Sequence, residues 1–233
     1  MKLYENVVIG NFLYSLGFAI CAKSKTIVNP VSINLLQQTP MDKLLGDVLI
    51  QGSGTLRLIE FKQVTNKSKK EIYKHENLLR AIKGDDLIKI SRSVHWFVET
   101  GVQNNKKMMA SRVVPYLDAF SSTNAQYDFN EFIQSTASET VDNNSKFSQE
   151  SLRAYLRIVA NMNGNDTSGA GGLVLHLDKS GSIVFCELQD LMQLRLSDRE
   201  YQQQMTIHYE NSKSVDQEFS HSKQKTPDRG LEF

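Results

Sequence analysis

Apolar and polar residues follow two different periods in the first part of the chain. A helix over residues 3–22 is predicted by apolar positions near helical spacing, Leu3, Val7, Leu13 and Leu16. Residues 25–36 look extended, but Pro30 indicates an edge strand or a break. The segments 47–51 and 55–64 then predict a β-hairpin, with Gly52 and Gly54 in its turn.

A helix and a strand are predicted after this hairpin. Ser68 is a suitable N-cap for a helix that continues to about residue 83, where Gly84 and two acids end it. Residues 87–99 are rich in Ile, Val, Trp and Phe and predict a strand. A strand–helix–strand passage such as residues 55–98 normally joins parallel strands. The predicted fold is therefore α/β, in the order αβββαβ, with a mixed four-stranded sheet.

The remaining residues predict a mainly helical C-terminal extension that contains one β-hairpin. Three helices are expected, over residues 108–120, over residues 129–140 and after an N-cap at Ser148. The hairpin is predicted at 173–177 and 183–188, with a short helix near 197–208 after it. The expected organisation is a core over residues 1–100, an extension over residues 101–210 with hairpin 173–188, and a polar tail over residues 211–233.

Charge is distributed unevenly along a chain of ordinary composition. The 233 residues are 40% apolar, which is enough for a buried core, and the net charge is only +1. Residues 57–92 hold ten Lys/Arg and five Asp/Glu, a net charge of +5, whereas residues 126–233 have a net charge of −6. The basic segment favours a polyanionic partner. Cys21 and Cys186 lack metal-binding spacing, and their small number indicates a reducing cytoplasm.

The apolar segment at residues 7–22 has two interpretations. With Lys2 before it, it resembles the core of an export signal, but no small-x-small cleavage site follows. Polar residues also interrupt the region, namely Glu5, Asn6 and Asn11. The segment is too short and too polar for a membrane span. A buried helix of a cytoplasmic protein, with no membrane contact, is therefore favoured.

The first hairpin carries the most informative polar residues. Asp47 opens its first strand, and Glu60 and Lys62 lie in the second strand on either side of Phe61. Because alternate residues of a strand share a face, Glu60 and Lys62 are expected to project together and Phe61 to point away. Two carboxylates, with the carbonyl of Phe61 as a further ligand, suit Mg²⁺ beside a phosphate. The lysine can orient or deprotonate water, or stabilise developing charge.

Asp47, the hairpin and the run Glu60-Phe61-Lys62, within the order αβββαβ, resemble the PD-(D/E)xK phosphodiesterase superfamily. That superfamily includes restriction endonucleases and archaeal junction resolvases, and the resemblance covers about residues 1–100. It implies a restriction-endonuclease-like core in which Asp47 and Glu60 bind Mg²⁺ or Mn²⁺ and Lys62 is the catalytic lysine.

Two further positions bear on this resemblance. Many such nucleases carry an acid on the first helix, and Glu5 matches that place, so the resemblance implies Glu5 as a further catalytic residue. Glu5 also shares a helical stripe with apolar residues that are expected to face inward, Ile9, Phe12 and Leu16. Gly46 departs from the family pattern, which has proline before the first acid.

The function that the resemblance implies is a metal-dependent endonuclease that hydrolyses DNA phosphodiester bonds in restriction or antiphage defence. Four lysines near the start of the predicted helix are candidates for holding phosphates: Lys67, Lys69, Lys70 and Lys74. One site cuts one strand at a time, so cutting a duplex requires a homodimer or two cleavage events. A separate protein partner can also supply target recognition. Two alternatives stay open: an inactive nuclease-like module that binds nucleic acid or protein, and a nuclease that cleaves RNA.

Asp47, Glu60 and Lys62 can instead be surface charges of an ordinary amphipathic hairpin. The second hairpin imitates the motif, with Asp178 followed by Glu187-Leu188-Gln189. That copy lacks the lysine and is interpreted as structural. The five histidines have no metal-ligating spacing, and the pair His95-Trp96 is expected to serve in packing.

Overall fold

The computed structural model describes ten segments of the chain. They are residues 4–24, 32–35, 46–51, 55–66, 69–103, 108–121, 127–142, 145–163, 172–177 and 183–188. The chain divides into two compact units, Met1–Arg195 and Leu196–Phe233, and every described residue belongs to the first. The helix predicted near 197–208 and the tail over 211–233 lie outside the described residues, as do Gly52, Gly54, Lys67 and Ser68.

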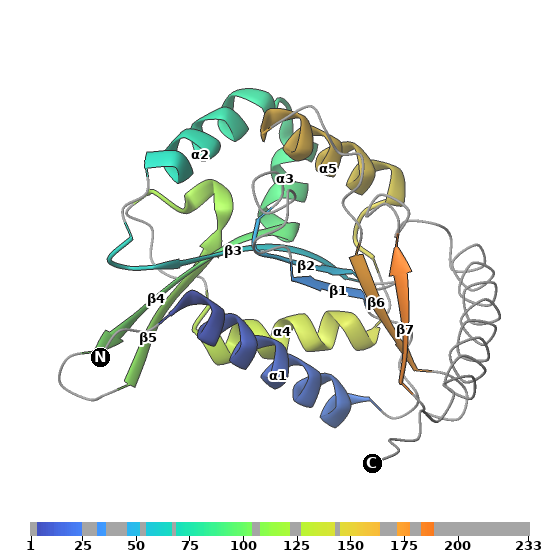
Figure 1. Ribbon diagram of the computed structural model, residues 1–233. Coiled ribbons are helices and arrows are strands. Elements are labelled where there is room, and N and C mark those ends of the chain that lie inside the picture. The colour runs from blue at the N-terminus through green and yellow to red at the C-terminus, as the bar shows by residue number, and fades with distance from the viewer. Residues whose placement is uncertain are drawn as a thin grey trace, which may run out of the picture. The chain divides into compact units, whose positions relative to one another are not determined.

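A five-stranded mixed sheet is the main β-structure (Figure 1). Its strands follow one another in sequence order: β1 (Ser32–Leu35), β2 (Val48–Gln51), β3 (Leu56–Gln63), β4 (His95–Gln103) and β5 (Met108–Pro115). β3 and β4 are parallel, and the other neighbouring pairs are antiparallel. The predicted hairpin of β2 and β3 and the predicted parallel pairing across residues 55–98 are therefore confirmed.

Helices cover both faces of this sheet. α1 (Glu5–Lys23) and α4 (Phe129–Asp142) lie on one face, and α2 (Lys69–Ala81), α3 (Asp85–Val94) and α5 (Gln149–Asn163) lie on the other (Figure 1). A 3₁₀ turn, η1 (Tyr116–Asp118), follows β5. A separate antiparallel hairpin consists of β6 (Gly172–Leu177) and β7 (Ile183–Leu188). The fold is α/β as predicted, and the helices expected at 3–22, at 129–140 and after Ser148 are confirmed. Ser148 caps the last of these helices, because its Oγ accepts a hydrogen bond from Ser151 N–H at 3.1 Å.

The prediction of a strand over residues 87–99 is wrong for its first half. Residues 85–94 form α3, and the strand β4 begins only at His95. Ile90 and Val94 are buried at helical spacing, and the acids Asp85 and Asp86 occupy the first turn, where a helix dipole favours negative charge. Gly84 is therefore the N-cap of a second helix that follows α2, and its φ of +93° is one that glycine adopts readily.

The helix predicted over residues 108–120 is also wrong. Residues 108–115 form β5, which pairs with β4 along its whole length and adds a fifth strand to the four predicted. The β-branched pair Val113-Val114 is fully buried, and Pro115 ends the strand. Residues 1–100 are consequently not a separate unit, because β4 runs through residue 100 and α4 shares its core with α1.

The core between α1, α4 and the sheet is rich in aromatic side chains. Phe12 of α1 contacts Phe61 of β3 with ring centroids 5.5 Å apart, and Phe132 of α4 at 5.9 Å. The other strand residues of this cluster are Val48, Ile50, Ile59, Trp96, Val98 and Val113. Phe61 therefore points toward α1, away from the face that carries Glu60 and Lys62, as the strand alternation predicts.

α1 is apolar on nearly all sides. It buries five residues against the core, Val8, Ile9, Phe12, Leu16 and Ala19, whereas Tyr14 and Phe18 are 79% and 72% exposed. The prediction that this segment is too short and too polar for a membrane span is wrong by length and composition. Among the described residues, α1 is the one helix that has the length and composition to cross a membrane, and 33% of that window is buried. Its helical state is confirmed, and the cytoplasmic location stays a prediction.

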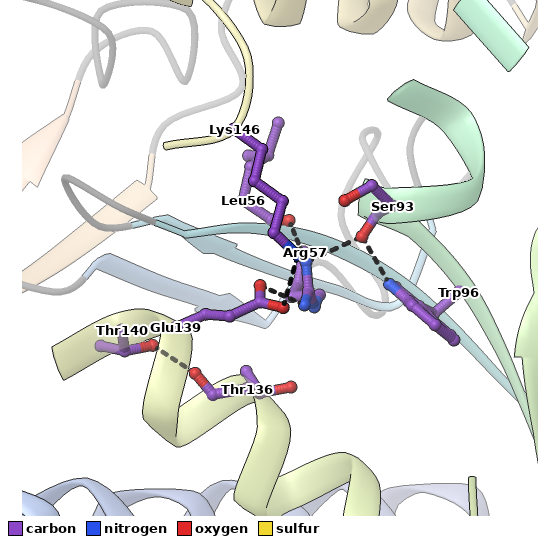
Figure 2. A network of polar contacts seen from close by, with 8 residues as sticks. All are labelled: Leu56, Arg57, Ser93, Trp96, Thr136, Glu139, Thr140 and Lys146. Carbon is purple, nitrogen blue, oxygen red and sulfur yellow. Dashed lines mark hydrogen bonds and ion pairs between the residues drawn. The ribbon is translucent and has the colours of Figure 1, made fainter. Parts of the chain in front are cut away.

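Arg57 of β3 is a buried cation held from three sides (Figure 2). Its guanidinium pairs with Glu139 of α4 and donates to the carbonyl of Ser93 at 2.8 Å. The guanidinium carbon lies 5.6 Å from the centre of the Trp96 ring. Burial lowers the pKa of Arg57, and the attraction of Glu139 opposes that shift. Glu139 is thus the counter-charge that makes burial of this arginine tolerable.

Candidate functional site

Asp47, Glu60 and Lys62 come together on the sheet face opposite Phe61. The Nζ atom of Lys62 lies 2.5 Å from Oε1 of Glu60 and 3.9 Å from Oδ2 of Asp47. Asp47 and Glu60 are only 3% and 2% exposed, and Lys62 is partly buried. The structure therefore brings together the three residues that the sequence singled out, while their chemical roles stay predictions.

The start of β2 determines where the Asp47 carboxylate lies. Asp47 N–H donates to the carbonyl of Ile59 at 3.1 Å, which aligns β2 with β3. Its side chain then turns to β3, where Oδ2 accepts the backbone N–H of Phe61 at 2.6 Å. A hydrogen bond from a backbone N–H to a buried carboxylate fixes the side chain and satisfies a donor that has no strand partner at this position.

Gly46 makes room for this arrangement. Its φ of +125° is open to glycine but closed to proline, whose ring holds φ near −65°. A Cβ atom at this position would lie 3.2 Å from Oε2 of Glu60 and 3.3 Å from the carbonyl oxygen of Ile59. A glycine at this position therefore fits the local backbone and the space that the Glu60 carboxylate occupies, whereas the proline expected from the resemblance would not.

Glu71 is a third buried carboxylate near this group, and sequence reasoning did not select it. It lies in the first turn of α2 and is 5% exposed. Oε1 accepts a hydrogen bond from the Tyr116 hydroxyl at 2.5 Å, and Oε2 lies 3.8 Å from Nζ of Lys74. In the sequence, Glu71 is one acid among several lysines, and nothing local indicates that Tyr116 covers it.

The electrostatics of the group are those of crowded carboxylates. Burial, followed by repulsion from Asp47 and Glu71, holds the pKa of Glu60 well above its ordinary value, and Lys62 and Lys74 act in the opposite direction. Burial alone would lower the pKa of Lys62, but attraction by Glu60 and Asp47 outweighs it and raises that pKa. Lys62 is therefore an ammonium at neutral pH, which suits it to donate hydrogen bonds and stabilise negative charge.

The other candidate lysines divide into two kinds. Lys69 and Lys70 are exposed at the start of α2 and are open to a ligand in solution. Lys74, one turn further, is partly buried and directed at Glu71. Lys67 lies outside the described residues.

Glu5 lies at the C-terminal end of β3. Its Oε1 accepts the backbone N–H of Gln63 at 3.2 Å and the side-chain N–H of Asn66 at 3.4 Å. α1 packs on the Phe61 face of the sheet, opposite Glu60 and Lys62. Glu5 therefore reaches the edge of the site from the other side of the sheet, and its catalytic role stays a prediction.

A buried aromatic network lies beside the site. His95 stacks on Tyr116 with ring centroids 4.2 Å apart, and its Nδ1 is 2.9 Å from the hydroxyl of Tyr155. Tyr155 also hydrogen-bonds Ser91 at 2.9 Å. His95 is thus a packed core residue, as expected. Burial, with Lys74 and His75 adding to it, lowers the pKa of His95 to about 3.

His95 is expected to make the protein less stable in mild acid. The unfolded chain binds a proton at His95 near pH 6.5, whereas the folded chain does so only near pH 3, so stability falls as pH drops through this window. The expected loss between pH 7 and pH 5 is about 2 kcal/mol. Urea unfolding of the wild type and of His95→Phe at both pH values measures it. Equal pH dependence in the two proteins would contradict the assignment.

The imitation of the motif belongs to the second hairpin, β6 and β7. Glu187 lies in β7, and the structure describes only the backbone of this strand. Asp178 and Gln189 lie outside the described residues. The structural interpretation of this imitation of the motif stays a prediction.

Comparison with known proteins adds no relative. No family model matches the chain, and neither the curated proteins nor the solved structures provide a match. The resemblance to PD-(D/E)xK enzymes therefore rests on the chain's own residues, and function must be argued from the geometry of the site.

The donor set fits a hydrated hard cation. Asp47 and Glu60 present two carboxylates side by side, and Mg²⁺ is commonly held by one or two carboxylates while it keeps several waters. No three His, Cys, Asp or Glu side chains form a metal-binding group within the described parts of the chain. If Asp47 and Glu60 hold a cation, its other ligands would be water and backbone oxygens.

Proposed function

We propose that this chain is a metal-dependent endonuclease that hydrolyses DNA phosphodiester bonds, with Mg²⁺ or Mn²⁺ as cofactor. The observation that carries the proposal is the meeting of Asp47, Glu60 and Lys62 on one sheet face. The order of α1, β2, β3 and the parallel strand β4 around them supports the resemblance to PD-(D/E)xK nucleases.

Each residue has a role that follows from its surroundings. Asp47 and Glu60 would hold the cation, which when bound supplies charge neutralisation at the phosphate and lowers the pKa of water. The Lys62 ammonium donates hydrogen bonds to the phosphate oxygens that gain charge as the bond breaks. Lys69 and Lys70, exposed at the N-terminus of α2, hold the neighbouring backbone phosphates.

The biological setting is part of the same proposal. A small nuclease with one site per chain cuts a duplex through a homodimer or through two events, or receives its target from a separate protein. Restriction or antiphage defence in the cytoplasm suits such an enzyme.

A cleavage assay on the wild type and on Asp47→Ala tests this proposal. Labelled DNA and RNA are incubated side by side with Mg²⁺ or with a chelator. We expect DNA cleavage that needs Mg²⁺ and that falls by about 10³-fold or more in Asp47→Ala, because the variant lacks a cation ligand. Asp86→Ala is the matched control, since Asp86 is 95% exposed on α3, and should cleave like the wild type.

The outcomes separate the proposal from its alternatives. If RNA is cleaved in preference to DNA, the protein is an RNA-cleaving nuclease and not a deoxyribonuclease. Equal binding of DNA by both proteins, with cleavage by neither, would favour the inactive nuclease-like module. Cleavage that survives in Asp47→Ala would contradict the assignment of the site.

A further inference from the structure

The two oxygens of the Glu71 carboxylate have different surroundings. Oε1 is occupied by the hydroxyl of Tyr116, a side chain that is 3% exposed. Oε2 faces the ammonium of Lys74 at 3.8 Å, which is beyond direct hydrogen-bonding distance. The carboxylate is therefore oriented by one strong bond, and one of its oxygens keeps capacity to accept further hydrogen bonds.

Glu71 also lies within electrostatic reach of the proposed site. It lies in α2, which covers the sheet face that carries Glu60 and Lys62 (Figure 1). Its charge acts on both of these residues in the same direction as the charge of Asp47. Phe97 is the register partner of Glu60 on β4, and its ring centroid lies 6.3 Å from that of Tyr116. Glu60 and Glu71 thus lie on the same side of the sheet, with Phe97 beside Glu60 and Tyr116 between Phe97 and Glu71.

We propose that Glu71 is a third acidic residue of the cation site, which accepts hydrogen bonds from the water shell of the divalent ion, and that Tyr116 is the positioning residue that orients it. This inference rests on the proposed function, because it assumes that Asp47 and Glu60 hold the ion. A Mg²⁺ ion that retains its water molecules needs hydrogen-bond acceptors around those waters. A buried, oriented carboxylate is a strong acceptor of this kind.

The surroundings of Tyr116 suit it to this role. Its ring is stacked on His95, nearly parallel at 5°, so the hydroxyl has a fixed direction. Burial, followed by repulsion from Glu71, raises the pKa of Tyr116, which keeps the hydroxyl protonated and donating. Tyr116→Phe would keep the stacked ring and remove only the hydroxyl that holds Glu71.

Calorimetric titration with Mg²⁺, on the full chain without nucleic acid, tests the inference. Glu71→Gln keeps the shape of the side chain and its bond with Tyr116 but removes the charge, and we expect its Mg²⁺ affinity to fall by about 10- to 100-fold. Tyr116→Phe should weaken Mg²⁺ binding in the same direction and by less. The matched control is Glu76→Gln, on the same helix, where a 51% exposed acid pairs with Arg80 and should leave the affinity unchanged.

Failure of this inference and failure of the proposed function give different results. If Asp47→Ala loses Mg²⁺ binding while Glu71→Gln and Tyr116→Phe bind like the wild type, Glu71 has no role and the proposed function stands. If the wild type binds no Mg²⁺, both are overturned. If Glu71→Gln does not fold, judged by circular dichroism, wild-type affinity in Tyr116→Phe would overturn the positioning role.

Discussion

Lys62→Met is expected to slow DNA cleavage by about 10²- to 10³-fold, the usual cost of removing a donor that stabilises charge in the transition state. Methionine keeps most of the apolar stem of lysine, so the space beside Glu60 stays largely filled. The ammonium that lies 2.5 Å from Glu60 is lost. Initial rates of plasmid nicking at fixed Mg²⁺ measure the effect.

A lysine outside the site provides the control for this experiment. Lys89 on α3 is 68% exposed and pairs with Asp86, so Lys89→Met should nick DNA at the wild-type rate. Circular dichroism must show that Lys62→Met is folded, since the neighbouring carboxylates of Asp47 and Glu60 lose a counter-charge. A folded Lys62→Met protein that nicks DNA within about threefold of the wild-type rate would exclude Lys62 from the chemistry.

Glu139→Ala is expected to lower the free energy of unfolding by about 3 kcal/mol, because it leaves the buried guanidinium of Arg57 without its counter-charge. Arg57 is 3% exposed, and the carbonyl of Ser93 and the Trp96 ring, which also contact it, carry no formal charge. Urea unfolding monitored by tryptophan fluorescence suits this measurement, because Trp96 is the single tryptophan and lies against Arg57.

Two further variants show whether charge causes this loss. Lys146 is 69% exposed and lies 3.9 Å from Glu139, so Lys146→Ala should change stability by less than about 0.5 kcal/mol. The double variant Arg57→Met with Glu139→Leu should recover most of the stability, since no buried charge then remains. A double variant as unstable as Glu139→Ala would indicate lost packing instead.

Local patterns predicted the elements whose sequence signal is unambiguous. α1, α4 and α5 carry apolar residues at helical spacing, and the β2–β3 hairpin alternates as a strand pair should. The errors fell on two apolar segments that fit either period, residues 87–94 and 108–115. Long-range pairing decides the second case, because β4 offers an edge to which residues 108–115 can bond.

The candidate site was predictable where its residues are neighbours in sequence, and hidden where they are not. Glu60 and Lys62 share a face because they are two residues apart on one strand. Glu71 is recognised as an oriented, buried acid only through Tyr116, 45 residues further along the chain, whose hydroxyl donates a hydrogen bond to it. Arg57 likewise appears in the sequence as an ordinary basic residue, until Glu139, 82 residues away, pairs with it.

The most direct test of the central claim is a crystal of the protein soaked in Mn²⁺ and measured at the manganese absorption edge. The account predicts an anomalous peak between the carboxylates of Asp47 and Glu60, with the ammonium of Lys62 beside it. A map without manganese at this position, in which Lys62 still bridges the two acids, would contradict the account and leave the three residues as an internal ion pair.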